Sequence, residues 1–328
     1  LQQCGPVLAT RGNLNNDIGV PLTLLRLRDE PYAVIEMGAN HAGEIDYLTH
    51  LAQPDVAVLN NAGRAHLEGF GSLEGVARAK AEIIRGLADN GVFVFNADDA
   101  FAGLWRELAE GRRQHTFGVR QPADVSSPPE VYEVVWHDAR FEARFPVVCA
   151  HGEIELQLQL AGEHNRMNAL AAVAASLMVG AGLDDAAAGL ATLAPVPGRL
   201  CPLAGINGAR LIDDSYNANP DSVLAALRVL AAAPGRRTLV LGDLAELGDD
   251  AVQLHRELGE RAAVMGVDRL LTIGRLSQHA GAKFGAEHRH YAERERLVGD
   301  HEIDVALDQV RGRRRRRPPS CRPRHRQS

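Results

Sequence analysis

Lysine is scarce in this 328-residue sequence: only Lys80 and Lys283 occur among 36 basic side chains, and the others are arginine. Any role that requires a primary amine therefore has two candidates. Cysteine is also rare, and its four copies are widely separated without a CxxC pair. This spacing argues against a disulfide framework or a zinc site, and it fits the reducing cytosol.

Several other features are absent. No run of about 18 uncharged apolar residues exists, which excludes a membrane-spanning helix. The first residues have no Met, basic region or apolar stretch of a signal peptide, so we expect the sequence to come from the middle of a longer protein. Both lysines follow alanine. The phosphate-binding motif GxxxxGK[ST] is therefore missing, because its lysine follows glycine.

The charge is unevenly distributed. The net charge is −6, but residues 311–328 contain nine Arg and no acid, which leaves 27 basic and 42 acidic side chains in the first 310 residues. An acidic body argues against a nucleic-acid surface. We interpret the arginine-rich end as a disordered tail or an out-of-frame translation.

Hydrophobic patterning predicts an α/β protein with about two domains. Short apolar strands are expected at residues 32–37, 55–60, 91–96, 237–242 and 269–274. Helices are expected at residues 44–52, 72–87, 168–180, 184–193 and 251–265. Strands that alternate with helices predict parallel sheets covered on both faces. Residues 117–160 alternate polar and apolar, which predicts a small antiparallel patch, and the Pro-rich segment 195–199 is the best domain boundary.

Lys80 falls on the apolar face of the helix predicted after Ser72, its expected N-cap. Burial lowers the pKa of a lysine and favours the neutral amine. A neutral amine reacts with carbon dioxide to form a carbamate, which is an anionic metal ligand. From the pattern alone, a lysine that snorkels to the surface is an equally good interpretation.

Glu36 and His66 follow two predicted strands at the sheet edge where α/β proteins place their ligands. A carboxylate at a strand end also occurs for structural reasons. Together with Lys80, however, these residues form a candidate cluster for a hard cation such as Mg²⁺, although His is an unusual Mg²⁺ ligand.

Two polar segments are further candidates. Asn165 and Asn168 open an Ala-rich helix and suit the edges of adenine, although asparagine near a helix start is more often a cap. In the segment that includes Asn217 and Asn219, Asn219 is the expected N-cap and Pro220 the first helical residue. This helix start would hold a carboxylate or phosphate, or it would simply be capped.

Taken together, these motifs resemble those of the Mur ligases, and within that family those of the branch that adds D-alanyl-D-alanine. The matching stretches occur in family order over roughly residues 7–298: TRGNLNNDIGVPLTL (10–24), EMGANHAGEI (36–45), NAGRAHLEGFGS (61–72), AKAEI (79–83), GEHNRMNAL (162–170), PGRL (197–200), DDSYNANP (213–220) and LGDLAELG (241–248). The resemblance implies a central domain over residues 1–194, an incomplete Rossmann-like C-terminal domain over 195–300 and an atypical tail over 301–328.

The resemblance implies ATP-dependent amide formation in the cytoplasm. ATP would phosphorylate the terminal carboxylate of UDP-N-acetylmuramoyl-tripeptide, and D-alanyl-D-alanine would attack the acyl phosphate. The cofactors would be ATP and Mg²⁺, and we expect a monomer that binds neither nucleic acid nor membrane. The implied roles are metal binding and catalysis for Glu36, His66 and a carbamylated Lys80; nucleotide binding for Asn165, Asn168, Arg199 and Asp214; and substrate binding for Asn15, Asn16, Tyr216, Asn217 and Asn219.

The sequence also departs from the family. The N-terminal UDP-binding domain and the P-loop are missing, Arg64 replaces a usual proline, and the arginine-rich tail replaces the family's last strand. We therefore expect a fragment or a disrupted reading frame with little activity alone. Two alternatives remain: a folylpolyglutamate or cyanophycin synthetase, and a non-catalytic binding protein with a basic tail.

Overall fold

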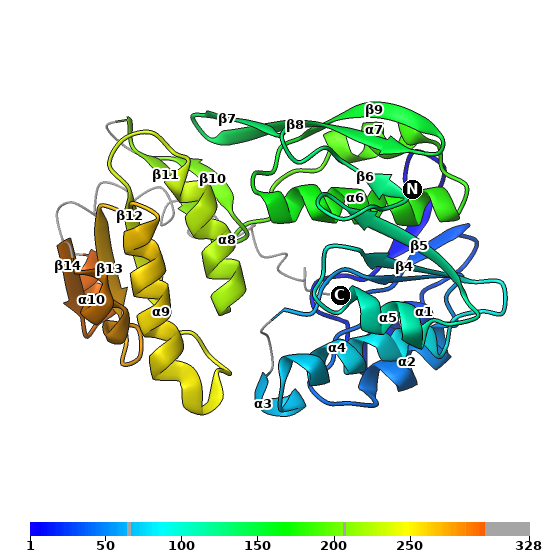
Figure 1. Ribbon diagram of the computed structural model, residues 1–328, viewed down its shortest axis with the longest axis horizontal. Coiled ribbons are helices and arrows are strands. Elements are labelled where there is room, and N and C mark those ends of the chain that lie inside the picture. The colour runs from blue at the N-terminus through cyan, green and yellow to red at the C-terminus, as the bar shows by residue number, and fades with distance from the viewer. Residues whose placement is uncertain (64–66, 206–207, 286, 299–328) are drawn as a thin grey trace, which may run out of the picture.

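The computed structural model describes residues 1–63, 67–205, 208–285 and 287–298. The chain forms two α/β bodies that lie side by side, with the N-terminus in the larger one (Figure 1). Within the described residues, no helix is both long and apolar enough to cross a membrane.

The chain begins with a small parallel pair of strands. β1 (Val7–Ala9) pairs with β2 (Tyr32–Val34), and α1 (Gly19–Leu24) connects them. The strand predicted at residues 32–37 is therefore too long. The backbone turns away after Val34 because Glu36 N donates to Thr10 Oγ1 (2.9 Å) and Gly38 N donates to Asn15 O (2.8 Å).

A seven-stranded sheet dominates the larger body. Its strands are β3 (Val56–Leu59), β4 (Val92–Asn96), β5 (Arg113–Gly118), β6 (Val125–Ser126), β7 (Glu133–His137), β8 (Arg140–Cys149) and β9 (Gly152–Leu158). β3 to β6 are mutually parallel, whereas β8 pairs antiparallel with β6, β7 and β9. This arrangement confirms the predicted parallel sheet with an antiparallel patch.

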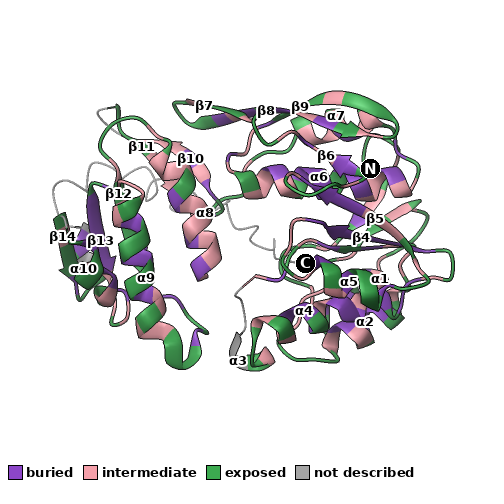
Figure 2. Cartoon of the chain, viewed as in Figure 1, coloured by how far each residue is buried: buried purple, intermediate pink, exposed green. Residues whose placement is uncertain are grey.

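The helices of the larger body pack on the two faces of this sheet or on one another. They are α2 (Glu44–Ala52), α3 (Leu67–Phe70), α4 (Leu73–Ala81) with the 3₁₀ turn η1 (Glu82–Ile84), α5 (Ala102–Leu108), α6 (Glu163–Met178) and α7 (Leu183–Ala191). On one face, α6 packs on Val94, Phe117 and Phe145 through Leu170 and Val173. On the other face, Phe93 and Phe95 of β4 pack with Trp105 of α5. β4 is buried on both faces, as expected for a central parallel strand (Figure 2).

The helix predicted at residues 72–87 is shorter than expected. Ser72 is its N-cap, as predicted, since its side chain accepts a hydrogen bond from Gly75 N. The α-helix nevertheless ends at Ala81, and η1 follows. Gly86 then passes so close to α2 that a Cβ on it would lie 2.4 Å from the Thr49 carbonyl carbon. Close packing on α2 therefore redirects the chain, although the apolar pattern continues.

The second body contains an antiparallel pair and a parallel sheet. β10 (Cys201–Ala204) pairs with β11 (Arg210–Asp213), and β12 (Thr238–Gly242), β13 (Arg269–Ile273) and β14 (Glu287–Tyr291) form a parallel sheet. Its helical elements are α8 (Pro220–Ala231), η3 (Gly248–Asp250), α9 (Ala251–Val264), α10 (Gln278–Phe284) and α11 (Arg294–Val298). The predicted strands at 237–242 and 269–274 and the helix at 251–265 are confirmed.

Candidate functional site

The predicted metal ligand Glu36 lies just beyond β2, beside a predicted substrate residue. Asn15 Nδ2 donates to Glu36 Oε1 at 2.8 Å. Gly38 is needed next to this pair, because a Cβ there would lie 2.9 Å from Asn15 Nδ2. The neighbouring Asn16 has a local role, since its Oδ1 accepts a hydrogen bond from Gly19 N at the start of α1. The structure thus joins Glu36 to Asn15.

The loop at residues 60–63, which follows β3, collects contacts from three parts of the chain. Asn60 Nδ2 donates to Asn168 Oδ1 on α6 at 2.6 Å. Asn61 O accepts a hydrogen bond from Lys80 Nζ on α4 at 2.9 Å. Ala62 N donates to Asp99 Oδ2, beyond β4, at 3.0 Å. The carboxyl ends of β3 and β4 therefore form the centre of the candidate site, as the strand-end rule predicts.

Lys80 is held in a low-polarity environment. Burial lowers the pKa of its ammonium group, and the negative charge of Asp99 opposes this shift only in part. The direction agrees with the prediction from the helical pattern, because burial disfavours the charged form. Asp99 was not predicted as a site residue, although it also follows a strand.

Hydrogen bonds and close backbone packing join the segments that carry the candidate metal ligands. Glu82, directly after α4, accepts hydrogen bonds from Gly43 N at 2.9 Å and from Asp46 N at 3.3 Å, at the start of α2. Gly69 on α3 approaches the Asn40 carbonyl so closely that a Cβ would lie 2.1 Å from its oxygen. His66 lies outside the described residues. Among the described residues, no three His, Cys, Asp or Glu side chains are grouped to hold a metal ion.

The start of α6 presents two amides on one face. The helix was predicted from residue 168 but begins at Glu163, directly after Gly162 at φ +99°. Asn165 and Asn168 therefore both lie in its first turns. Asn168 Nδ2 contacts Asn165 Oδ1 at 3.4 Å, and Asn165 Nδ2 donates to Ala161 O at 2.8 Å. The two predicted adenine-side residues are thus neighbours, as expected for a spacing of three.

His164, in the same turn, should make the free energy of unfolding depend on pH. Burial, and to a lesser extent the charge of Arg228 on α8, lowers its pKa from 6.5 to about 4. Between these values the unfolded chain binds a proton that the folded chain does not, so stability falls as the pH drops through this window. The expected loss from pH 7 to pH 4 is about 3 kcal/mol.

Urea unfolding of His164→Gln at both pH values measures this effect. The variant should lose less stability on acidification than the wild type, whereas replacing the exposed His151 by Gln should leave the loss unchanged. Equal losses in the wild type and His164→Gln would contradict the assignment.

The predicted nucleotide residues of the second body form a separate cluster. Leu200 N donates to Asp214 Oδ1 at 3.0 Å, and burial raises the pKa of the Asp214 carboxyl. The Arg199 guanidinium lies over the Tyr216 ring, 4.6 Å from its centroid. In the described part of the chain, no hydrogen bond links this cluster to Asn165 or Asn168.

The segment before α8 is strongly capped. Asn219 Oδ1 accepts from Ser222 N at 2.9 Å, and Asn219 N donates to Ser222 Oγ at 2.9 Å. Pro220 is the first helical residue, as predicted. Asn217 Oδ1 accepts a hydrogen bond from Ala218 N. The capping interpretation of Asn219 is therefore confirmed, and its amide NH₂ remains a candidate for substrate binding.

Replacing Asn219 by alanine should cost about 1 kcal/mol of stability, because Ser222 N loses its acceptor. Asn219→Ser restores a capping oxygen and should lose only a few tenths of a kcal/mol. Thermal unfolding of the two variants tests the difference. Equal melting temperatures for Asn219→Ala and the wild type would show that the cap contributes nothing.

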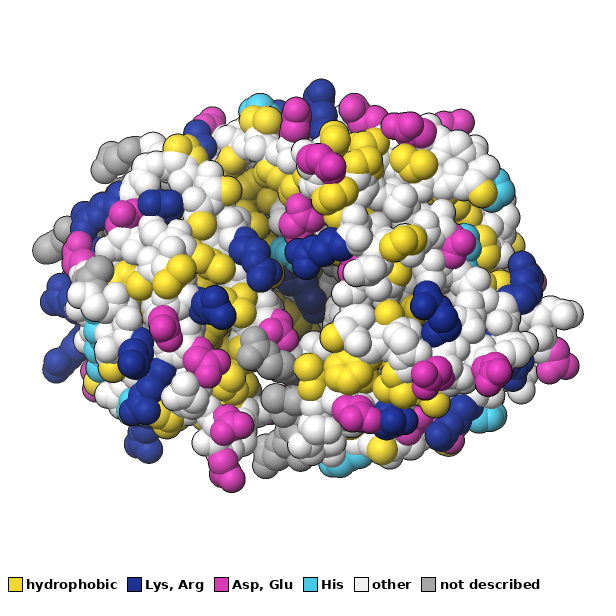
Figure 3. Space-filling model, in the orientation of Figure 1, with side chains coloured by type: hydrophobic (Ala, Val, Ile, Leu, Met, Phe, Trp, Pro, Cys, Tyr) yellow, Lys and Arg dark blue, Asp and Glu magenta, His cyan; other side chains and the backbone are white. Residues whose placement is uncertain are grey.

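The start of α8 lies beside the loop at residues 60–63. A Cβ on Gly63 would lie 3.7 Å from Asp221 Oδ2 and 3.5 Å from Asn61 Oδ1. The space-filling view shows the surface hollowed between the two bodies, with Lys and Arg side chains gathered in the hollow (Figure 3). The loop at residues 60–63 and the α8 start therefore approach one another across the two bodies.

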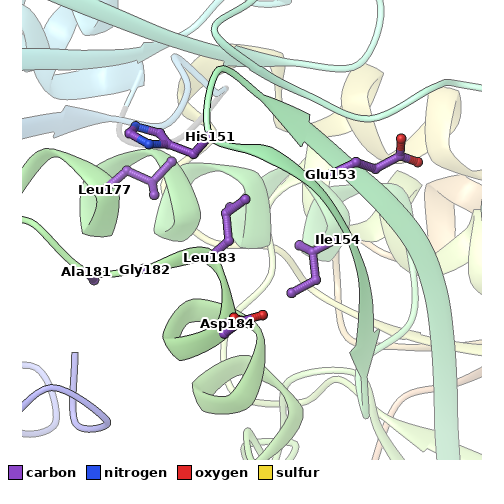
Figure 4. Close-up of a pocket in the computed structure, with 8 residues that line it drawn as sticks. All are labelled: His151, Glu153, Ile154, Leu177, Ala181, Gly182, Leu183 and Asp184. Carbon is purple, nitrogen blue, oxygen red and sulfur yellow. The ribbon is translucent and has the colours of Figure 1, made fainter.

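A cavity of about 370 Å³ lies elsewhere, between the β8–β9 turn and the end of α6 (Figure 4). It is lined by His151, Glu153 and Leu177, among others. Leu177 is 12 residues beyond Asn165, which corresponds to about 18 Å along a helix. This cavity is therefore separate from the candidate site.

Comparison with known proteins explains this arrangement. Residues 1–176 match the Mur ligase middle domain, and residues 198–310 match the Mur ligase glutamate ligase domain. The UDP-N-acetylmuramoyl-tripeptide--D-alanyl-D-alanine ligase of Escherichia coli K12 is 45% identical over 94% of this chain and 68% of its own length. The Bacillus subtilis enzyme of the same name is 35% identical over 88% of this chain and 62% of its own.

Solved structures give the same result. A crystal structure of MurF from Acinetobacter baumannii matches with a TM-score of 0.85 and 37% identity, over 94% of this chain and 66% of that one. MurF from Thermotoga maritima, in complex with ADP, matches with a TM-score of 0.80 and 28% identity, over 93% and 69%. The chain thus spans about two thirds of the length of these relatives. The chain belongs to the Mur ligase family.

Proposed function

We propose that this chain carries most of the active site of an ATP-dependent amide ligase that adds D-alanyl-D-alanine to UDP-N-acetylmuramoyl-tripeptide. The observation that carries the proposal is the loop at residues 60–63. It joins Lys80, the Asn165–Asn168 pair and the start of α8, which are the segments expected to bind the reacting carboxylate, the nucleotide and the dipeptide. The 45% identity to the Escherichia coli ligase supports this reading over both alternatives, the other superfamily synthetases and a non-catalytic binding protein.

The reaction has two steps. The tripeptide carboxylate takes the γ-phosphoryl group of ATP, which gives an acyl phosphate and ADP. The amine of D-alanyl-D-alanine then attacks the acyl carbon, the C–N bond forms, phosphate leaves and the amine loses a proton. The first step brings a carboxylate up to the ATP phosphates, and the second develops negative charge on the acyl oxygen and the departing phosphate, so catalysis depends on positioning and on positive charge.

The residues present suit a magnesium site by their chemistry. Glu36 offers an exposed carboxylate, held by Asn15, and carboxylate oxygen is a ligand that Mg²⁺ prefers. The lowered pKa of Lys80 favours the neutral amine, which is the form that can be carbamylated. When bound, Mg²⁺ would neutralise charge on the phosphates. We propose that Glu36, His66 and carbamylated Lys80 hold it.

The remaining roles are distributed over both bodies. Asn165 and Asn168 would bind adenine, and Arg199 and Asp214 would contact the nucleotide from the second body. Asn15 and Asn16 would contact substrate, and Tyr216, Asn217 and Asn219 the incoming dipeptide. The contact between Arg199 and Tyr216 supports a nucleotide site next to the dipeptide site. We propose a cytoplasmic monomer, in keeping with free cysteines at positions 4, 149 and 201.

Phosphate release from ATP and Mg²⁺ tests the proposal. The purified chain is assayed with UDP-N-acetylmuramoyl-tripeptide, with and without D-alanyl-D-alanine. The chain alone should release little phosphate, since it lacks a P-loop to cradle the β- and γ-phosphates. Fusion to the part of the Escherichia coli relative that it does not match should give release that requires the dipeptide. A fusion that prefers glutamate as acceptor would contradict the assignment.

A further inference from the structure

We propose that Asn60 is a positioning residue that sets which atoms of the nucleotide base the site accepts. It does not belong to the predicted site, yet its Nδ2 donates to Asn168 Oδ1 at 2.6 Å, a short hydrogen bond. The inference rests on the proposed function in one respect, namely that Asn165 and Asn168 face an adenine base.

This hydrogen bond is the first of a chain of three that runs from Asn60 through Asn168 and Asn165 to Ala161. We call this chain the relay. An amide accepts through its oxygen and donates through its NH₂ group, so fixing one end fixes the other. Asn60 donates to Asn168 Oδ1, Asn168 Nδ2 then faces Asn165 Oδ1 at 3.4 Å, and Asn165 Nδ2 donates to Ala161 O at 2.8 Å. The Ala161 carbonyl orients Asn165, whereas Asn60 orients Asn168, because its 2.6 Å hydrogen bond is much shorter than the 3.4 Å contact between the two amides of α6.

The direction of the relay determines whether the two amides of α6 offer a ligand hydrogen-bond donors or acceptors. Each NH₂ group has two N–H bonds, and the relay uses one of them in Asn165 and one in Asn168. The other N–H of each residue remains for a ligand, whereas each carbonyl oxygen already accepts one hydrogen bond and tolerates an unused lone pair better than an N–H tolerates having no acceptor. A base at this position is therefore favoured when it presents acceptor atoms, and the ring nitrogens of adenine are such acceptors.

Asn60 is well placed to impose this direction. It follows β3 directly, and its neighbour Asn61 accepts the hydrogen bond from Lys80. The backbone here is thus held from both sides, by the sheet and by Lys80. Asn60 can therefore align the Asn168 amide before a nucleotide arrives, which lowers the cost of ordering it on binding.

Analogues that lack one ring nitrogen test the relay. The 328-residue chain is titrated with ADP and with 1-deaza-, 3-deaza- and 7-deaza-ADP, and NMR spectra give the dissociation constants. NMR titration can measure dissociation constants up to the millimolar range. For the wild type, at least one analogue should bind about fivefold more weakly than ADP, the size of one lost hydrogen bond.

In Asn60→Asp this preference should disappear. Aspartate only accepts, so Asn168 must turn its NH₂ toward residue 60 and its oxygen toward the base. Asn60→Ser, whose side chain is too short to span the contact, gives the same test if the aspartate variant does not fold. Asn90→Asp is the matched control, because residue 90 precedes β4 at the opposite edge of the sheet.

A double-mutant cycle separates this role from a general structural one. The effect of Asn60→Ala on ADP affinity should vanish in an Asn168→Ala background if Asn60 acts through Asn168. Equal ADP preference in the wild type and Asn60→Asp, or no analogue preference in the wild type, would overturn the relay while leaving the nucleotide site in place. Absence of ADP binding to the wild type would overturn both the relay and the proposed nucleotide site.

Discussion

Replacing Lys80 by alanine should lower the rate of dipeptide-dependent ligation by about 10²–10³, the loss seen when one group that stabilises transition-state charge is removed. Lys80 Nζ lies at the centre of the site, where it donates to Asn61 O, and its burial favours the reactive neutral amine. Without it, the site loses both a positioned amine and the anionic ligand that a carbamate would provide.

The measurement is kcat for ADP formation by the fusion described above. Lys80→Arg distinguishes the two roles, since arginine keeps the positive charge but forms no carbamate under these conditions. We expect it to be as impaired as Lys80→Ala. Lys283→Ala, which changes the other lysine of the chain on α10, is the matched control and should retain the wild-type rate. An active Lys80→Arg variant would show that charge alone suffices.

Replacing Arg166 by methionine should destabilise the larger body by about 3 kcal/mol, because it leaves buried acceptors without donors. The Arg166 side chain is fully buried. Its guanidinium donates to Ser127 Oγ at 2.7 Å and to the Pro128 carbonyl, and it lies 5.3 Å from the Tyr132 ring centroid. One side chain therefore holds the whole segment at residues 127–132 against the start of α6.

Calorimetry measures this loss, which should lower the melting temperature of the larger body by roughly 10 °C. Arg78→Met is the matched control, since Arg78 is exposed and pairs with Glu74 one helical turn away. It should change stability by less than about 0.5 kcal/mol. Similar melting temperatures for the two variants would contradict the role of Arg166.

Position along the sequence was enough to predict which strand ends carry the candidate site residues. Glu36 and His66 were expected at the ligand edge because parallel strands end there together; Glu36 lies just beyond β2, and His66 lies outside the described residues. The same rule points to Asp99 and to Asn60, which follow strands in the same way. Neither was predicted, because their importance depends on contacts with Ala62 and Asn168, far away in the sequence.

Element boundaries were harder to predict. The start of α6 was placed too late because its first turn is polar, and that turn includes the candidate residue Asn165. The helix before Lys80 was extended too far because its apolar pattern continues through η1 and beyond. α1 was not predicted, since only six residues form it and it includes Pro21. For the helix that carries Lys80, the close packing of Gly86 on α2 decides where it ends.

The proposed ligation passes through an acyl phosphate formed at the tripeptide carboxylate. The most direct test uses UDP-N-acetylmuramoyl-tripeptide with ¹⁸O in its terminal carboxylate, the fused chain, ATP, Mg²⁺ and D-alanyl-D-alanine. If one carboxylate oxygen leaves with the phosphate, each turnover yields phosphate that carries one ¹⁸O atom, and this yield requires the dipeptide. Turnover that releases only unlabelled phosphate would contradict the account.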